Sequence, residues 1–131
     1  SADTQAKHLG LRARIQLLGV GDNKQGQVVV ALNQPIHAEQ IELSFSHPVN
    51  EQRDFHLQLS AETPLKFIGA ISLEQLYDSR WYVRLVEREH IFPPEKTIDA
   101  RAAEEVWRLS GELKKIASPV AEALSHELLL D

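Results

Sequence analysis

Two histidines that flank one polar turn are the residues best suited to chemistry in this chain. His47 and His56 bracket a segment that also carries Glu51 and Asp54. Directly opposite residues on antiparallel strands lie about 5 Å apart, so two such imidazoles can share a metal ion. Because metal sites usually need three or four ligands, the carboxylates would complete this one only if the loop folded back. We expect instead that His56 faces solvent from a strand and that His47 bonds to the backbone of its turn.

The composition limits the metal that such a pair would hold. The chain has six histidines but neither cysteine nor methionine. It therefore cannot form a disulfide, a cysteine-based zinc finger or an iron–sulfur cluster. A copper site would have to use histidine, carboxylate or backbone groups. His90 and His126 stand alone, in a predicted loop and in the tail, and we do not expect them to be ligands. The sequence predicts no cofactor.

The side chains of a nucleophilic triad also occur in this region. Ser44 and Ser46 precede His47, and Asp54 and His56 follow it. The chain nevertheless has no Gly-x-Ser-x-Gly elbow to expose a nucleophile and no glycine-rich loop to hold a phosphate. We therefore expect no enzymatic activity.

Three residues are candidates for contact with a protein partner. Arg53 and Asp54 lie in the turn, although in a purely structural role Asp54 would cap its backbone and Arg53 would pair with a neighbouring acid. Trp81 is expected to fill the core of a β domain. Its neighbour Tyr82 must then face outward, where it is either an interface aromatic or a cover for the stem of Arg84.

Short stretches of alternating apolar and polar residues predict the elements that position these side chains. Such alternation is typical of strands that bury one face each. Turn-forming residues separate the stretches at intervals that favour an all-β antiparallel sandwich. The expected strands are 11–17, 27–32, 41–46, 55–59, 65–69 and 81–86, with a helical turn at 71–77.

The stretch 100–116 fits two structures. Apolar residues at helical spacing slightly favour a helix, which Thr97 or Asp99 would cap. Alternation around Trp107 supports a seventh strand at 105–113 instead.

Length and composition indicate one domain with two appendages. The polar residues 1–10 would form a tether, 11–113 the β domain, and 114–131 a helical tail that starts at Ser118-Pro119. Pro93-Pro94 predicts an exposed loop before the last strand. A net charge of −5 argues against nonspecific binding of nucleic acid, which needs clustered lysine and arginine.

The chain contains no run of roughly twenty apolar residues, the length needed to span a bilayer. It begins at Ser1 and has no methionine, so we expect a processed product or a fragment. A removed signal peptide or a membrane anchor upstream of Ser1 stays open.

Three short runs resemble the FixH family, also called CcoH. They are LSFSHP at 43–48 followed by Arg53-Asp54, RWYVRL at 80–85, and WRLSG at 107–111. The resemblance covers about residues 9–113. Ser79 stands where the family usually has glycine, 88–104 looks like an insertion, and 114–131 has no counterpart.

The resemblance implies an immunoglobulin-like β-sandwich of about seven strands in the periplasm, with 105–113 as the last strand. It implies a single N-terminal transmembrane helix, absent from this chain, that tethers the domain to the bacterial inner membrane. It also implies an accessory role in assembly of the cbb3-type cytochrome c oxidase. The partners would be oxidase subunits and a copper-transporting P-type ATPase.

Two other functions remain open from the residues alone. A periplasmic copper-binding or carrier domain would use His47, His56 and carboxylates, and stoichiometric copper binding would favour it. A carbohydrate-binding or adhesion sandwich would expose a row of aromatic side chains, and the few aromatics of this chain argue against it. We expect a non-catalytic domain that binds membrane-protein partners.

Overall fold

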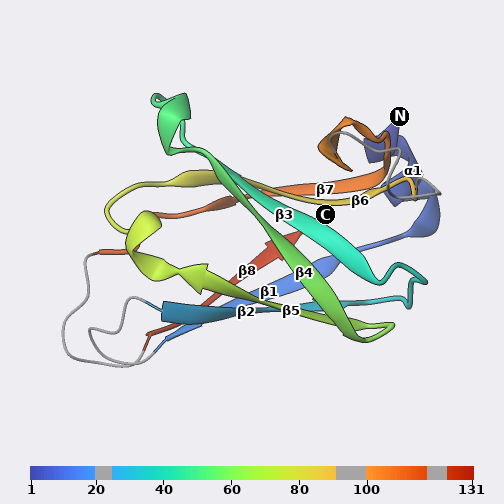
Figure 1. The fold of residues 1–131 in the computed structure, drawn as a ribbon, viewed down its shortest axis with the longest axis horizontal. Helices are drawn as coiled ribbons and strands as arrows, with labels where there is room; N and C mark the ends of the chain where they lie inside the picture. The colour runs from blue at the N-terminus through green and yellow to red at the C-terminus, as the bar shows by residue number, and fades with distance from the viewer. Residues whose placement is uncertain (20–24, 91–99, 118–123) are drawn as a thin grey trace.

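Antiparallel strands make up most of the protein (Figure 1). The computed structural model describes residues 1–19, 25–90, 100–117 and 124–131. The predicted all-β class is confirmed, and each of the seven expected strands is present. The elements are α1 (Ala2–Leu9), β1 (Ala13–Gly19), β2 (Gln25–Leu32), β3 (Gln40–Ser46), η1 (Glu51–Arg53), β4 (Phe55–Thr63), β5 (Lys66–Ser72), η2 (Leu73–Gln75), β6 (Trp81–Arg88), η4 (Ala100–Ala102), β7 (Glu105–Leu113) and β8 (Leu124–Leu130).

The strands belong to one sheet that folds over on itself. Its order is β7-β6-β3-β4-β5-β2-β1-β8, and all neighbouring strands are antiparallel. β4 makes the corner, because its first half pairs with β3 and its last residues pair with β5 through a bulge. The halves on either side of β4 face each other across the core, which gives the sandwich-like architecture (Figure 1).

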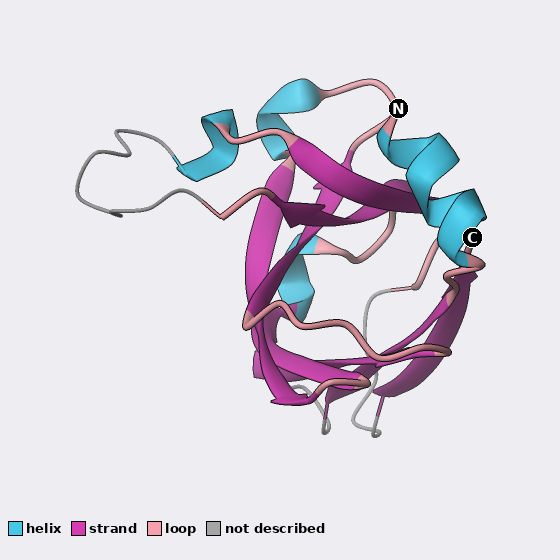
Figure 2. Ribbon diagram, turned by 90° about the vertical axis from the view of Figure 1, so that its right-hand side faces the viewer, coloured by secondary structure: helices cyan, strands magenta, loops and turns pink. Residues whose placement is uncertain are grey.

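The two outermost strands of this sheet meet and nearly close it. Ser110 in β7 exchanges two backbone hydrogen bonds with Asp131, just after β8, with N···O distances of 3.2 and 3.4 Å. Gly111 faces Leu130 so closely that a Cβ atom at this position would require the Leu130 side chain to shift. Seen from the end that carries α1, the strands curve round a common interior (Figure 2).

Alternate residues of the strands fill this interior. The largest side chains with less than 2% exposure are Trp81, Trp107, Phe45 and Phe67. Trp81 is thus the core anchor that the sequence predicted. Its buried indole N–H donates to the carbonyl oxygen of Leu76 at 3.0 Å, which satisfies its polar atom.

Residues 1–10 form a docked helix, and the predicted tether is wrong. The Ser1 side chain caps α1 by accepting from the Thr4 N–H, and Gly10 ends the helix with φ of 63°. Ala6 is buried where α1 packs on β7. The tether was expected because this segment is mostly polar. α1 is too short to cross a membrane, as is every other helix in the described residues.

The helical tail predicted at 114–131 is also wrong in the part that the structure describes. β8 pairs with β1, with Leu128 opposite Ile15 and Leu130 opposite Ala13. Leu128 and Leu130 are buried and Leu129 between them is exposed, which is the burial pattern of a strand. Ser118-Pro119, the expected start of the helix, lies outside the described residues.

The ambiguous stretch 100–116 is mainly strand, as the family resemblance implied. β7 spans Glu105–Leu113, and η4 is a single turn of 3₁₀ helix before it. The predicted caps Thr97 and Asp99 and the Pro93-Pro94 loop lie outside the described residues. The helical turn expected at 71–77 is confirmed as η2.

Candidate functional site

The turn between β3 and β4 is held together by its own polar side chains. Asn50 caps η1, because its side-chain oxygen accepts from the Gln52 N–H at 3.1 Å. Asp54 Oδ1 accepts from the backbone N–H of His47 at 2.7 Å, which joins the two ends of the turn. Asp54 therefore caps the backbone, the structural role that the sequence suggested for it.

The imidazole of His47 is engaged at both nitrogens. Nδ1 accepts from the backbone N–H groups of Val49 at 3.2 Å and Asn50 at 3.0 Å. Nε2 lies 2.9 Å from Ser79 Oγ and 3.3 Å from Nη1 of Arg53. In a catalytic triad Nδ1 of the histidine donates to a carboxylate, whereas here Nδ1 accepts from the backbone of its own turn.

Arg53 packs over the indole of Trp81 instead of pairing with an acid. Its guanidinium carbon is 5.2 Å from the ring centroid. Nη1 donates to Ser79 Oγ at 3.0 Å, and Nη2 donates to the Gln75 carbonyl oxygen at 3.3 Å. These bonds join the turn to the segment that leads into β6. We call the group that makes these contacts the turn clasp: His47, Arg53, Asp54, Ser79 and Trp81.

Trp81, a member of the clasp, is also the centre of an aromatic cluster. Its ring meets those of His47, Phe55 and Phe45 edge to face, with centroids 5.2, 5.6 and 6.4 Å apart. Phe45 and Phe55 stack on each other at 4.8 Å. The strand before the turn, the strand after it and β6 are therefore fixed to one another around a single buried indole.

The clasp leaves one apolar side chain in solvent. Val49 is 89% exposed, the highest value among the exposed large hydrophobic residues of the described chain. The turn that carries it lies at one end of the molecule, and α1 and the N-terminus lie at the other (Figure 1). The sequence prediction missed Val49, although an apolar residue between Pro48 and Asn50 in a polar turn was the available signal.

The structure does not bring His47 and His56 together. His56 is exposed on the outer face of β4, directly opposite Ser44 of β3. His47 contacts the buried ring of Trp81, on the core side of the sheet. The two imidazoles that the sequence made candidates for a shared ion thus lie on different faces.

The remaining predicted ligands are also separated from one another. Glu51 is exposed in η1, and His90 is exposed after β6. His126 lies in β8, opposite Leu17 of β1. Within residues 1–19, 25–90, 100–117 and 124–131, no three histidine, aspartate or glutamate side chains are grouped as metal ligands would be.

Tyr82 lies on the outer face of β6 and is 45% exposed, as predicted. It is opposite Ser46, the last residue of β3 before the turn clasp. The guanidinium carbon of Arg80 is 5.9 Å from the centroid of its ring, and Arg80 pairs with Glu112 of β7 at 3.5 Å. Tyr82 is therefore the predicted contact residue whose ring faces solvent.

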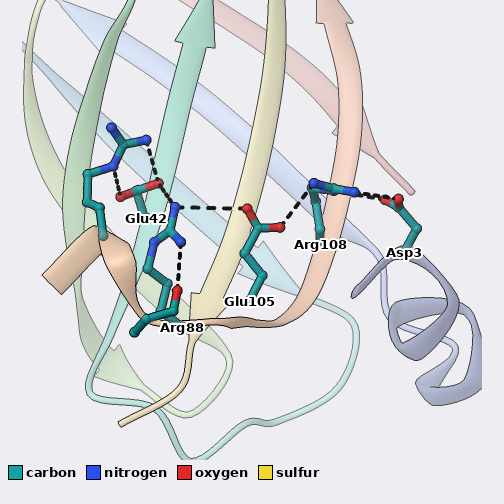
Figure 3. Close-up of polar contacts among 7 residues, drawn as sticks. Asp3, Glu42, Arg88, Glu105 and Arg108 are labelled. Carbon is teal, nitrogen blue, oxygen red and sulfur yellow. Dashed lines mark hydrogen bonds and ion pairs between the residues drawn. The ribbon is translucent and has the colours of Figure 1, made fainter. Parts of the chain in front are cut away.

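A second polar cluster lies at the end of the molecule that carries α1, and the sequence prediction missed it (Figure 3). Glu42 of β3 is only 2% exposed. Its oxygens accept from Arg101 Nε at 2.8 Å and from Arg88 Nη2 at 3.1 Å. Burial raises the pKa of Glu42, but the two guanidinium groups outweigh burial and hold the pKa below its ordinary 4.5. Glu42 is therefore ionised at neutral pH.

The cluster continues across the sheet to α1. Glu105 lies 3.9 Å from Arg88 and 3.1 Å from Arg108. Arg108 donates two hydrogen bonds to the carboxylate of Asp3, at 3.1 and 2.7 Å. The hydrogen bond from Arg108 lowers the pKa of Asp3 and raises the pKa of Arg108 itself. No local sequence pattern predicts this network, because its members come from distant parts of the chain.

A comparison with protein families identifies the kind of domain that contains these features. The FixH family matches residues 1–114. The chain belongs to the FixH family. A search of curated proteins returned no match. The family match includes α1 and extends through β7, so it covers both the turn clasp and the Glu42 cluster.

One departure from the family pattern has a clear role in this FixH-family chain. Ser79 occupies the position before Arg80-Trp81 at which the resemblance leads us to expect glycine. Its hydroxyl joins His47 to Arg53, so Ser79 contributes a bond that glycine cannot make. The family recognised from short sequence runs is confirmed. The first two runs meet at Trp81, and the third pairs with the rest of β6.

Proposed function

We propose that this FixH-family chain is the periplasmic domain of a membrane-anchored accessory protein that assists assembly of the cbb3-type cytochrome c oxidase. It acts without catalysis, by binding membrane-protein partners at the inner membrane. These partners are oxidase subunits and a copper-transporting P-type ATPase. Membership of the FixH family supports the accessory role.

The observation that carries a binding role is the exposure of Val49 on a fixed turn. The turn is held by Asp54 at one backbone N–H and by the His47 ring at two more. A segment that is ordered before binding loses little conformational entropy when a partner docks. An apolar side chain that is 89% exposed on such a segment is suited to enter a pocket on a partner.

The position of the turn suits a domain tethered from its N-terminal side. The N-terminus and α1 lie at the end of the molecule opposite the turn (Figure 1). A membrane anchor attached before α1 would therefore leave the turn pointing away from the bilayer. In that orientation the turn would meet the periplasmic parts of its partners.

No observation favours the copper-binding alternative or a hydrolase. Both nitrogens of His47 are committed to hydrogen bonds, and His56 faces the other side of the sheet. Nδ1 of His47 also accepts from two backbone N–H groups, where the histidine of a triad donates to a carboxylate.

Complementation of bacterial cells that lack the gene tests the proposal. The full anchored protein should restore assembled oxidase, measured by haem staining of native gels and by oxygen uptake. The variant Val49→Asp should lower the amount of assembled oxidase several-fold, because a carboxylate cannot enter an apolar pocket without a partner. Thermal unfolding of the isolated domain should not change, since Val49 contributes almost nothing to the core.

The matched control is Leu129→Asp, which replaces an apolar residue that is 67% exposed on β8. This variant should assemble oxidase as well as the wild type does. Full complementation by Val49→Asp would show that the turn is not the contact. Normal oxidase levels in cells without the gene would overturn the accessory role itself.

A further inference from the structure

The outer face of the β7-β6-β3-β4 half carries one aromatic and one basic side chain on the same strand. Tyr82 and Arg84 are two residues apart in β6, so both point away from the core, about 7 Å apart along the strand. Tyr82 is opposite Ser46, and Arg84 is opposite Ser44. On its other side Arg84 is opposite Ser110 of β7.

The serines that surround this pair are short, so the two long side chains stand clear of their neighbours. Across the next strand, His56 is opposite Ser44 and is also exposed. On its β7 side Tyr82 is opposite Glu112, whose carboxylate pairs with Arg80. The side chains of Tyr82 and Arg84 are therefore accessible, and the carboxylate nearest to Tyr82 is already paired. We call Tyr82, Arg84 and the flanking Ser44 and Ser46 the β6 face.

Arg84 is exposed and makes no ion pair within the part of the chain that the structure describes. The acid that its positive charge reaches is Asp3, but two hydrogen bonds already bind that carboxylate to Arg108. Arg80, which lies on the other side of Tyr82, is likewise paired with Glu112. Arg84 is thus the arginine of this face that is available to pair with an acidic group of a partner.

We propose that the β6 face binds an extended acidic segment of a protein partner. The segment places a carboxylate on Arg84 and, two residues away, an aromatic or other apolar side chain on Tyr82. The spacing follows from strand geometry, since side chains two residues apart share a face in both molecules. The proposal rests on the partner-binding role proposed above, and it names the chemistry of the partner.

The β6 face is continuous with the turn clasp. Ser46 pairs with Tyr82 and is followed directly by His47, so this face adjoins the turn that carries Val49. A guanidinium and an aromatic ring are the side chains most often responsible for binding energy at protein interfaces. The β6 face therefore supplies specificity next to an apolar anchor.

Titration of the isotope-labelled chain with short peptides tests this assignment. The probe is a soluble ten-residue peptide that contains repeated Phe-Ser-Glu, and its matched control contains Phe-Ser-Gln. The acidic peptide should shift the amide signals of β6 and of Ser44 and Ser46, and binding should weaken as salt is raised. Arg84→Glu should weaken binding at least about tenfold, because it replaces an attraction by a repulsion. Tyr82→Ala should weaken it by a smaller factor.

The control for net charge is Arg12→Glu, which changes an exposed arginine next to β1 by the same two units of charge. It should leave the affinity for the acidic peptide unchanged. Equal binding of the acidic and amide peptides, or equal loss in both charge variants, would overturn the proposal.

Two further outcomes would assign the β6 face to a different occupant and so overturn the proposal. One is Arg84-dependent binding to vesicles of anionic phosphatidylglycerol with no peptide binding. The other is self-association of the chain that Tyr82→Ala abolishes, seen by sedimentation. If the peptide fails while the anchored protein still supports oxidase assembly in cells, the β6 assignment fails and the accessory role stands.

Discussion

At the scale of single residues, the polar side chains of the β3–β4 turn act as structural fasteners. His47 accepts two backbone hydrogen bonds and shares a third with Ser79. Arg53 covers Trp81, and Asp54 joins the ends of the turn. Residue types that suggest a metal site or a triad are thus used to hold a loop in shape. We expect each of these contacts to contribute to stability.

Replacing His47 tests this structural role. His47→Ala removes three hydrogen bonds and the edge contact with Trp81. It should lower the free energy of unfolding by about 2 kcal/mol, measured by urea denaturation. His56→Ala, at an exposed strand position, should change it by less than about 0.5 kcal/mol. Equal effects of the two substitutions would contradict the assigned role of His47.

The buried carboxylate of Glu42 gives a second residue-scale prediction. Glu42→Gln removes the charge that faces Arg88 and Arg101 and should cost about 3 kcal/mol of stability at neutral pH. The protein should express and unfold cooperatively, which allows the measurement by urea denaturation.

The lowered pKa of Glu42 also fixes the sign of a pH effect. Because its pKa is lower in the folded state, its stabilising contribution is present above about pH 4.5 and is lost as pH falls further. Stability of the wild type should therefore fall more steeply in acid than that of Glu42→Gln. Parallel curves for the two proteins would show that Glu42 does not titrate as described.

At the scale of elements, β8 shows where periodicity alone misleads. Apolar residues at helical spacing predicted a helix in the tail, but three consecutive leucines at 128–130 can bury one face of a strand equally well. β1 favours the strand, because the backbone N–H and C=O groups along its second edge need hydrogen-bond partners, and β8 supplies them. When a short segment fits both the helical and the strand period, its secondary structure depends on the elements that lie beside it in the fold.

Hydrogen exchange followed by NMR checks the strand. Amides of β8 that bond to β1 should exchange as slowly as those of β1 itself, because both belong to one ladder. Fast exchange throughout Leu124–Leu130, with slow exchange in β1, would be evidence of a frayed tail.

α1 is the other element that the sequence prediction missed. Its signals were present, since Ser1 and Gly10 are good capping residues, but a polar helix with one buried alanine has almost no apolar stripe. The two hydrogen bonds from Arg108 to the Asp3 carboxylate hold α1 against β7, where apolar packing alone is weak.

Removing that bond should release the helix without unfolding the sheet. Arg108→Ala should speed amide exchange in α1 several-fold and leave the β-strand amides protected. Arg14→Ala, which breaks the exposed pair with Glu127, is the matched control and should leave α1 unchanged. Loss of protection over the whole sheet in Arg108→Ala would show that α1 is not an independent unit.

At the scale of the whole molecule, the predictable part of the fold was its first seven strands. Period-two alternation along each strand follows from burial of one face, and that pattern is local. The closing of the sheet depends on the approach of Gly111 to Leu130, and the Glu42 cluster depends on residues far apart in the chain. Such long-range arrangements leave no local pattern, which is why the site centred on Trp81 was predicted only in part.

The two ends of the molecule carry different groups of residues. One carries α1 and the network from Asp3 to Glu42, and the other carries the turn clasp with Val49 (Figures 1 and 3). A tether at the first end would present the second to partners beyond the membrane surface. If the two ends of this FixH-family chain divide the roles of tether and contact in this way, Val49 should touch a partner directly.

Photo-crosslinking in cells measures that contact. A photoreactive amino acid replaces Val49 in the full anchored protein, and a second variant carries it in place of Leu129, which is also exposed. Crosslinked products are isolated from membranes and identified by mass spectrometry. We predict crosslinks from position 49 to subunits of the cbb3-type oxidase or to the copper-transporting ATPase, and few from position 129. Absence of such products from position 49, or equal yields from both positions, would contradict the account.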